Sequence, residues 1–534
     1  MSRSQRWARI DVAADPPRIE VPRRYNAAVE FIDRNIHEGR GDRFALVDDN
    51  GSYTYRELYH RVNQAGQVLR QAGVQMEQRV LLCLNDGIEF AAVFWGAIKI
   101  GAVPVPINTR LTRPNCMKVL SDSRARALVV ERSLADKFAV PADSHSSSCR
   151  MITTNDGASG QSNLSRLMAA APVELEAAPT TADDIAFWLY TSGSTGQPKG
   201  VLHMHRSLIH TAVLFGQCVL GIHRDDRVFS ASKMFFAYGL GNTMTFPFSV
   251  GATSVVSAVW PTPETVYNVI HEHCPTIFCA VPTLYHRLLT DFEEIAGELP
   301  ASLRLCVSAG EPLPQETGRR WQALSGIAIV DGLGSTEMLQ TFLSNRPGQV
   351  RYGSTGTVVP GYQLRLVDAS GDTLGAGQIG ELLVAGPSAA VGYWNRQTQT
   401  VRTFVGRWTR TGDQYIVDKD NYYYYCGRGD DMLKVGGIWV SPFEVESVLL
   451  CHPLVCECAV VGQADDGGLI KPKAFVVLKD PGQARAAVAD QLKSFACEHL
   501  AAYKHPRWVE FLDELPKTAT GKVRRFKLRA GASG

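Results

Sequence analysis

The stretch TYRELYHRVNQAGQVLRQAGV at residues 54–74, followed by RVLLCLN at residues 79–85, decides the fold class. The first segment has the apolar spacing of an amphipathic helix, and the second is a short apolar run typical of a buried strand. This helix and strand alternation extends from about residue 25 to 178 and returns in LRLCVSAG (303–310) and IAIVDGLG (327–334). Such a rhythm predicts a layered α/β fold.

The pattern of expected helices and strands changes twice after residue 349. Short strands separated by Gly-rich turns predict a β-rich subdomain at about residues 350–427. Helix and strand alternation then resumes after GRGDD (427–431), where two glycines and two acids interrupt the pattern. We therefore expect a large N-terminal domain of residues 1–427 and a small α+β domain of residues 428–534.

Composition excludes several classes of protein. The 534 residues include 55 Lys and Arg against 53 Asp and Glu, and 45% of residues are hydrophobic, as in an ordinary globular protein. A net charge of +2 argues against a nucleic-acid-binding protein, since such proteins neutralise many phosphates and are clearly basic. The expected substrate is a small molecule.

Three features bear on localisation. The N-terminal segment has arginines but no apolar core, so no secretory signal is expected. The most apolar stretch, Ala91–Ile107, contains Lys99 and two prolines and is shorter than a membrane span, which predicts a buried helix that runs into a strand. The 12 cysteines are scattered, and the cluster at residues 451–458 lacks zinc-finger spacing. A cytoplasmic protein with no membrane contact is expected.

The stretch YTSGSTGQPKG at residues 190–200 follows an apolar strand and is rich in hydrogen-bond donors. Its hydroxyl and amide donors are Thr191, Ser192, Gly193, Ser194 and Thr195. Lys199 adds a positive charge, so the loop suits a polyphosphate, although it does not match the Walker A pattern. A flexible Ser/Gly loop without a ligand is the alternative.

Two further strand ends carry polar residues. SAGEPLP (308–314) and DGLGSTEM (331–338) both follow apolar strands, and ligands gather at such ends in open α/β sheets. Glu337 beside Thr336 could hold Mg²⁺ against phosphate oxygens. The alternative is a helix start, because Ser or Thr before Glu often caps a helix. By contrast, GAGQIG (375–380) matches a dinucleotide-binding pattern in the wrong context and indicates turn glycines.

The last candidates lie near the boundary and near the C-terminus. Asp413 in RTGD could accept hydrogen bonds from both hydroxyls of a ribose, and Arg428 follows it closely. Lys522 lies in PKTATGKVRR, for which a solvated basic tail is the alternative. No nucleophile elbow is present, so an acyl-enzyme is not indicated.

Taken in order, YTSGSTGQPKG, GSTE, RTGD, GRGDDMLKVGG and PKTATGKVRR resemble the adenylate-forming superfamily of acyl-CoA synthetases, luciferases and peptide-synthetase adenylation domains. The resemblance extends over nearly the whole chain from about residue 53. It implies a large N-terminal domain of two α/β layers plus a β-rich subdomain, and a small mobile C-terminal domain.

The resemblance also implies roles for individual residues. Residues 191–199 would bind phosphate, Thr336 would contact a phosphate, Glu337 would bind Mg²⁺, and Lys522 would stabilise charge between the attacking carboxylate and the α-phosphate. The implied adenine pocket is Gly310, Glu311, Pro312, Asp331 and Gly332. The implied ribose, hinge and thioester-step residues are Asp413, Arg428, Asp430, Lys434, Gly436 and Gly437.

Within the superfamily, KMFFAYGLGN (233–242) and DGLGSTEMLQTFLSNRPG (331–348) resemble the benzoate-CoA ligase branch. The implied lining of a flat slot for an aromatic ring is Phe236, Ala237, Tyr238, Gly239, Ala309, Gly334, Gln340 and Thr341. Gly332 and Gly334 would let the ring approach the backbone. Gln340 stands where the benzoate enzymes carry His, so a ring amino or hydroxyl group is expected to find a partner there.

The resemblance implies an ATP- and Mg²⁺-dependent aryl-CoA ligase. The acid and ATP would give an aryl-AMP and pyrophosphate, and CoA would then displace AMP to form the thioester. An amino- or hydroxybenzoate such as anthranilate is the expected acid. One alternative is an adenylation enzyme that loads an aryl acid onto a carrier protein, and another is a nucleotide-binding regulator without turnover.

Overall fold

The computed structural model describes residues 6–139, 149–154, 162–192, 198–290, 292, 299–429, 431–435, 438–465, 469–517 and 523–531. One layer contains a five-stranded parallel sheet. Its strands in spatial order are β6 (Val103–Pro106), β5 (Arg79–Cys83), β7 (Ala127–Val130), β8 (Arg150–Thr153) and β9 (Ser162–Asn163).

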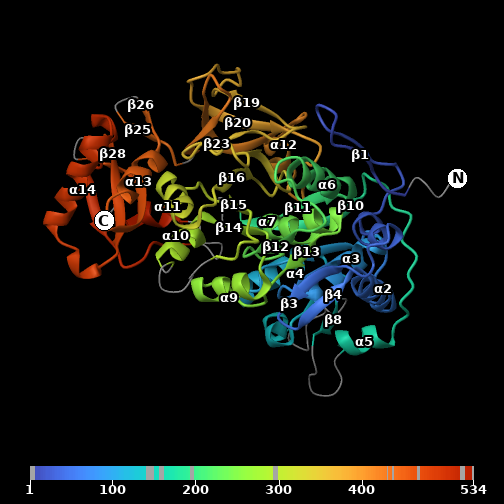
Figure 1. The fold of residues 1–534 in the computed structure, drawn as a ribbon. Coiled ribbons are helices and arrows are strands. Elements are labelled where there is room, and N and C mark those ends of the chain that lie inside the picture. The colour runs from blue at the N-terminus through green and yellow to red at the C-terminus, as the bar shows by residue number, and fades with distance from the viewer. Residues whose placement is uncertain are drawn as a thin grey trace.

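Helices α2 (Tyr55–Gln71) and α3 (Ile88–Lys99) pack together beside this sheet (Figure 1). A capping box starts α2, since Thr54 and Glu57 each accept the other's backbone amide. The apolar stretch 91–107 is the buried α3 running into β6, as predicted. Lys99 is fully buried there, and its Nζ lies 2.7 Å from Oδ1 of Asp33. No helix among the described ranges is long and apolar enough to cross a bilayer.

The second layer is a nine-stranded sheet with parallel strands in its centre and antiparallel strands at its edges. Its spatial order is β18 (Thr357–Val358), β17 (Thr341–Ser344), β16 (Ile329–Gly334), β15 (Leu305–Ala309), β14 (Ile277–Ala280), β12 (Arg227–Ser230), β13 (Thr253–Val255), β3 (Phe44–Asp48) and β4 (Gly51–Thr54). Strand β13 pairs with one side of β12 and β14 with the other, so the order reverses at β12. Ligands of open α/β sheets bind beyond the carboxyl ends at such a reversal.

Alternate residues of the central strands face two hydrophobic clusters. Val228 and Val307 belong to the larger cluster, while Phe229 and Cys306 pack with α9 (Pro263–His273), α10 (Pro282–Thr290) and α11 (Gln315–Ser325). Both faces of the sheet are therefore covered, which explains why its strands are continuously apolar. The predicted α/β fold class is confirmed.

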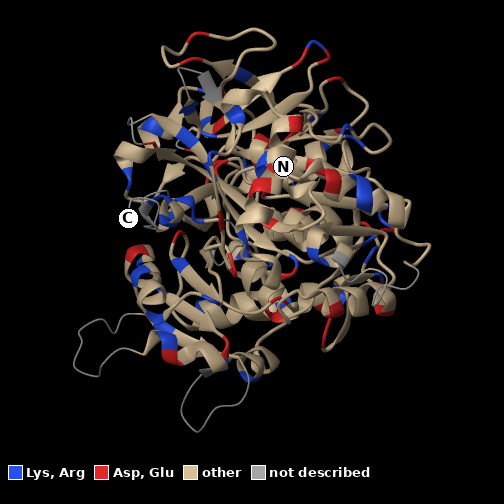
Figure 2. Ribbon diagram, turned by 90° about the vertical axis from the view of Figure 1, so that its left-hand side faces the viewer, with Lys and Arg blue, Asp and Glu red and all other residues tan. Residues whose placement is uncertain are grey.

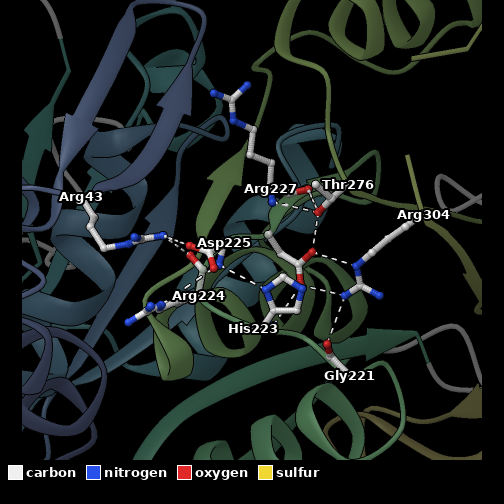
Figure 3. Close-up of polar contacts among 9 residues, drawn as sticks. Arg43, Gly221, His223, Arg224, Asp225, Arg227, Thr276 and Arg304 are labelled. Atoms are coloured by element: carbon white, nitrogen blue, oxygen red, sulfur yellow. Dashed lines mark hydrogen bonds and ion pairs between the residues drawn. The ribbon is translucent and has the colours of Figure 1, made fainter. Parts of the chain in front are cut away.

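The amino ends of the same strands meet at a closed polar cluster. Asp226 precedes β12 and is buried, and its carboxylate accepts from Arg304 at 2.7 and 3.0 Å and from the Thr276 hydroxyl at 2.6 Å. The backbone amide of His223 supplies a further bond of 2.9 Å. Figure 3 shows Thr276, Arg304 and His223 converging from separate segments.

After residue 350 the chain forms the predicted β-rich part. A five-stranded antiparallel sheet contains β19 (Gln363–Val367), β20 (Gly380–Ala385), β22 (Phe404–Val405), β23 (Trp408–Val417) and β24 (Tyr423–Arg428). The glycines of residues 375–380 lie in a turn and at the start of β20, as expected. Basic and acidic residues are interspersed over the molecule, in keeping with the balanced net charge (Figure 2).

The C-terminal elements gather at one end of the molecule, beside α10 and α11 (Figure 1). They are β25 (Leu433–Val435), β26 (Ile438–Val440), α13 (Pro442–Leu450), β27 (Val455–Ala464), β28 (Ile470–Leu478), α14 (Ala486–His499), β29 (Trp508–Phe511) and α15 (Arg525–Gly531). They build a hydrophobic cluster of their own, from Leu433 to Ala496. The division at residue 427 stays a prediction.

Candidate active site

Three loops that follow β12, β15 and β16 lie at the carboxyl edge of the nine-stranded sheet. Residues 232–239 follow β12, residues 310–312 follow β15, and residues 335–340 follow β16. Ala309 of β15 is paired with Gly332 of β16, so the predicted adenine and ring residues share one edge. The sheet therefore brings the loop residues singled out in the sequence into a single region.

The donor-rich stretch 190–200 begins and ends in an antiparallel hairpin of β10 (Ile185–Ser192) and β11 (Pro198–Met204). Thr191 is paired with Lys199. Gly193, Ser194 and Thr195 lie outside the described residues. The Nζ atom of Lys199 lies 4.3 Å from the centre of the Tyr393 ring, which is a cation–π contact.

Tyr393 connects this hairpin to Glu337. It belongs to β21 (Gly392–Tyr393), which pairs with β11, and its hydroxyl donates to Oε1 of Glu337 at 2.7 Å. Burial and the charge of Glu337 raise the pKa of Tyr393, so the phenol stays protonated as a donor. Lys199, Tyr393 and Glu337 thus form a continuous chain of contacts between the predicted phosphate loop and the predicted Mg²⁺ ligand.

Glu337 lies in a turn and not at a helix start. Residues 335–340 contain no helix, so the capping alternative is wrong. Leu339 in this turn has a φ of 66°, a left-handed conformation that costs a buried leucine roughly 1–3 kcal/mol. Backbone strain of this kind gathers at functional sites because the surroundings must enforce it.

A Mg²⁺ ion fits Glu337 as a single protein carboxylate. Protein-bound Mg²⁺ commonly takes one or two carboxylates and completes its octahedron with phosphate oxygens and water. Within the ranges that the structure describes, no group of three or more His, Cys, Asp or Glu side chains forms a self-contained metal site. An ion at Glu337 would therefore depend on a bound phosphate.

Two carboxylates near β15 and β16 carry oxygens without a partner among the described residues, Oδ1 of Asp331 and Oε1 of Glu311. Burial raises the pKa of Asp331 well above its usual value. The other oxygen of Glu311 accepts from the Thr283 hydroxyl at 2.6 Å. Buried acceptors of this kind suit a ligand that brings N–H donors, such as an adenine amino group.

Asp413 and Arg428 are directly paired across β23 and β24. The Nη1 atom of Arg428 lies 2.9 Å from Oδ1 of Asp413 and also donates to the carbonyl of Thr411 at 3.0 Å. Burial alone would lower the pKa of Arg428, but the Asp413 charge outweighs it and raises the pKa. The arginine thus fixes the position of the predicted ribose-binding carboxylate.

The predicted ring slot surrounds α7 (Ala237–Leu240), with Phe236, Ala237 and Tyr238 half-buried. The amide of Gln340 donates to the carbonyls of Ala237 and Tyr238 at 3.0 and 3.2 Å, and its Oε1 accepts from the amide and hydroxyl of Thr341. Both N–H groups and the carbonyl of Gln340 are therefore used inside the protein. The expected bond from Gln340 to a ring substituent is not available in this arrangement.

The two glycines expected to admit the ring also lie against neighbouring protein atoms. A Cβ atom on Gly334 would lie 2.9 Å from the Gln340 carbonyl oxygen, and one on Gly332 would lie 2.7 Å from Cγ2 of Thr341. Strand β17 therefore fills the space beside both glycines. A side chain at either position would clash there, so packing alone requires a glycine at both.

The remaining predicted residues are only partly covered. Lys434 is exposed on β25. Lys522, Asp430, Gly436 and Gly437 lie outside the described residues. All 12 cysteines are described and are free thiols, including Cys456 and Cys458 on β27.

Sequence reasoning missed Tyr393 and His203. Tyr393 stands in VGYWN, where a glycine before two aromatic residues was the available signal. His203 lies on β11, stacks on Phe187 with ring centres 5.1 Å apart, and has a pKa lowered to about 3 by burial. The imidazole is thus neutral at pH 7 and lies within the β10–β11 hairpin, paired with Phe187.

Comparison with known proteins agrees with this geometry. The family model for AMP-binding enzymes matches residues 33–394, and that for the AMP-binding enzyme C-terminal domain matches residues 444–522. The chain belongs to the AMP-binding enzymes, and its resemblance to the adenylate-forming superfamily is confirmed.

Individual relatives lie in the aryl-CoA ligase branch. The chain is 52% identical to the benzoate-CoA ligase of Thauera aromatica, over 97% of this chain and 98% of the relative. The crystal structure of a benzoate CoA ligase from Burkholderia xenovorans LB400 is 45% identical with a TM-score of 0.87, over 94% and 99% of the two chains. The anthranilate CoA ligase AuaEII in complex with anthranoyl-AMP is 41% identical with a TM-score of 0.88, over 96% and 98%.

Proposed function

We propose that this protein is an aryl-CoA ligase that converts a benzoate-type acid, ATP and CoA into an aryl-CoA thioester, AMP and pyrophosphate. The observation that carries the proposal is the meeting of two features at one sheet edge. One is the group of half-buried residues around α7 that the sequence predicts as the ring slot, and the other is the chain of contacts from Lys199 through Tyr393 to Glu337. The relatives named above support the aromatic acid and CoA as substrates.

The residues divide the work between the two half-reactions. In the first, Glu337 would hold Mg²⁺, which neutralises phosphate charge, while Thr191, Lys199 and Thr336 bind the phosphates. Asp331 and Glu311 would accept from adenine, and Asp413 from the ribose. Lys522 would stabilise the charge that builds up as the carboxylate attacks the α-phosphorus.

In the second half-reaction the CoA thiol attacks the aryl-AMP carbonyl and AMP leaves. We propose that Asp430 acts as a hinge that lets Lys434, Gly436 and Gly437 approach the site for this step. Two half-reactions with different charge distributions need different groups, and one moving domain can supply both sets.

For the acid, we propose benzoate as the first substrate to test. The expectation of an amino- or hydroxybenzoate rested on Gln340, and that side chain already makes four bonds within the protein. An apolar ring needs no polar partner there. Anthranilate and the hydroxybenzoates are also candidates, provided that a slot residue other than Gln340 bonds their amino or hydroxyl group.

The test is a panel of benzoate, anthranilate and the three hydroxybenzoates, with AMP release measured with and without CoA. We expect CoA-dependent AMP release with at least benzoate. A carrier protein offered in competition with CoA separates the rival reaction, because acyl transfer to the carrier in preference to CoA would contradict the proposal. Absence of AMP release with every acid would also contradict it.

A further inference from the structure

The loop that carries the predicted ring residues begins at a buried ion pair. Lys233 and Asp86 have side chains only 8% and 1% exposed, and Nζ lies 3.8 Å from Oδ2. The other oxygen of Asp86 accepts from the backbone amide of Met234 at 3.0 Å. One carboxylate therefore holds both the lysine and the backbone of the residue that follows it.

The pair ties this loop to both sheets. Asp86 follows β5 of the five-stranded sheet, and Lys233 follows β12 of the nine-stranded sheet. The Nζ atom of Lys233 donates to the carbonyls of Ser257 and Val259, each at 2.6 Å, beyond the end of β13. The two carbonyls use two of the three donors of the ammonium group, and the Asp86 carboxylate, 3.8 Å away, adds charge without a hydrogen bond.

The far end of the loop is held separately. Gln340 donates to the carbonyls of Ala237 and Tyr238, and the Tyr238 hydroxyl donates to the carbonyl of Val307 at 3.1 Å. The two ends are in close contact, because a Cβ atom on Gly239 would lie 2.1 Å from the Lys233 carbonyl oxygen. A shift of the backbone at Lys233 must therefore move α7.

We propose that Lys233 and Asp86 are positioning residues for the aromatic acid. They set the place of residues 236–238 and thereby decide which rings fit the slot. The inference rests on the proposed function, since it assigns the slot to an aryl acid. Neither side chain needs to touch the substrate, because small displacements of a binding group alone weaken productive binding.

The test is Lys233→Met, which keeps the length of the side chain and removes its charge. It leaves the buried Asp86 without its cation, so the loop is expected to shift. We expect KM for benzoate to rise about tenfold or more while KM for ATP stays unchanged. The preference of the enzyme for benzoate over benzoates with a larger para substituent should also fall.

Lys99→Met is the matched control. Lys99 is also a buried lysine, 2.7 Å from Oδ1 of Asp33, and it donates to Asn63 at 2.7 Å. Its bonds join α3 to neighbouring helices and not to the slot. We expect this variant to lower Tm while both KM values stay at their wild-type levels.

A double variant tests the pair itself. Asp86→Asn keeps an acceptor for the Met234 amide and removes the charge, so in the Lys233→Met background it should restore part of the affinity for benzoate. Asp86→Asn alone should raise KM for benzoate, and it replaces Lys233→Met if that variant does not fold.

An unchanged KM for benzoate in both single variants, with only a lower Tm, would overturn the inference and leave a purely structural ion pair. The wild-type assay separates this result from a failure of the proposed function. Benzoate-dependent AMP release in the wild type upholds the function whatever the variants do, whereas its absence with every acid counts against the function itself.

Discussion

A buried aspartate lies at each of the amino and carboxyl edges of the nine-stranded sheet, and the two differ in their hydrogen-bond partners and in the direction of their pKa shifts. At the amino edge, Asp226 accepts from Arg304, Thr276 and His223 (Figure 3). Burial alone would raise the pKa of its carboxyl, but the Arg304 and Thr276 bonds outweigh burial and lower it. At the carboxyl edge, Asp331 keeps an oxygen without a partner among the described residues, and burial raises its pKa.

Within one sheet, the amino edge contributes to stability and the carboxyl edge has the features of a binding site. Every donor that satisfies Asp226 stabilises the fold, so nothing is left there for a ligand. The unmet acceptor of Asp331 and the left-handed Leu339 cost stability, and a perturbed carboxyl in such a place indicates a binding site. At the amino edge, protein groups supply the hydrogen-bond partners of Asp226. At the carboxyl edge, a bound ligand would supply the partner that Asp331 lacks.

The largest expected effect is on catalysis and not on stability. Lys522→Ala should raise the barrier to adenylation by at least about 2.7–4 kcal/mol, because it removes a charge placed for the transition state. Pyrophosphate exchange measures this step. Thioester formation from supplied aryl-AMP should continue, and unimpaired exchange in the variant would remove Lys522 from its proposed role.

Asp226→Asn should act on stability instead. An amide N–H would face the donors of Arg304 and His223, which costs about 1–3 kcal/mol in the free energy of unfolding. The lowered pKa means that the stabilisation is full above the unfolded-state pKa of about 3.9 and is lost as pH falls through the folded-state value. Urea unfolding should show a deficit at pH 7 that shrinks below about pH 4, with KM values unchanged.

Asp331→Asn should show the reverse pH dependence. A carboxyl with a raised pKa stabilises the fold only while it is protonated, and this contribution is lost as pH rises through its folded-state pKa. Asn does not ionise, so the variant should gain stability relative to the wild type, by about 1.4 kcal/mol for each pH unit between the unfolded-state and folded-state pKa values. KM for ATP should increase in the same variant. If the difference in unfolding free energy between variant and wild type did not change with pH, the contrast drawn between Asp331 and Asp226 would be wrong.

Tyr393→Phe should have the smallest effect of the four. It removes a hydroxyl that donates to Glu337 at 2.7 Å and lies 3.4 Å from the Thr403 hydroxyl, and each bond is worth about 0.5–1.5 kcal/mol. A Mg²⁺ titration of AMP release should show weaker activation, while Tm changes little. Tyr55→Phe is a control, because its buried hydroxyl donates to the carbonyl of Ala252 at 2.6 Å and not to the turn that carries Glu337. Equal Mg²⁺ responses in both variants would show that Tyr393 does not orient Glu337.

Much of the fold could be predicted from the sequence because the apolar patterns that specify helices and strands lie within short segments. The spacing of apolar residues in 54–74 predicted α2, and the apolar run of 91–107 predicted a buried helix and strand. The failures concern side-chain partners. Gln340 was expected to face a ligand and instead bonds Ala237 and Tyr238, which lie more than 100 positions earlier in the sequence.

The sequence by itself determined the α/β layering, the order of the motifs and the membership of the chain in the AMP-binding enzymes. Periodicity and motif spacing are properties of short segments, so they survive without coordinates. Only the tertiary structure decided that Tyr393 bonds Glu337 and that Asp86 bonds the loop after β12, 148 positions away. Such contacts depend on how the sheets align, and a buried polar group takes whichever partner the packing brings within reach.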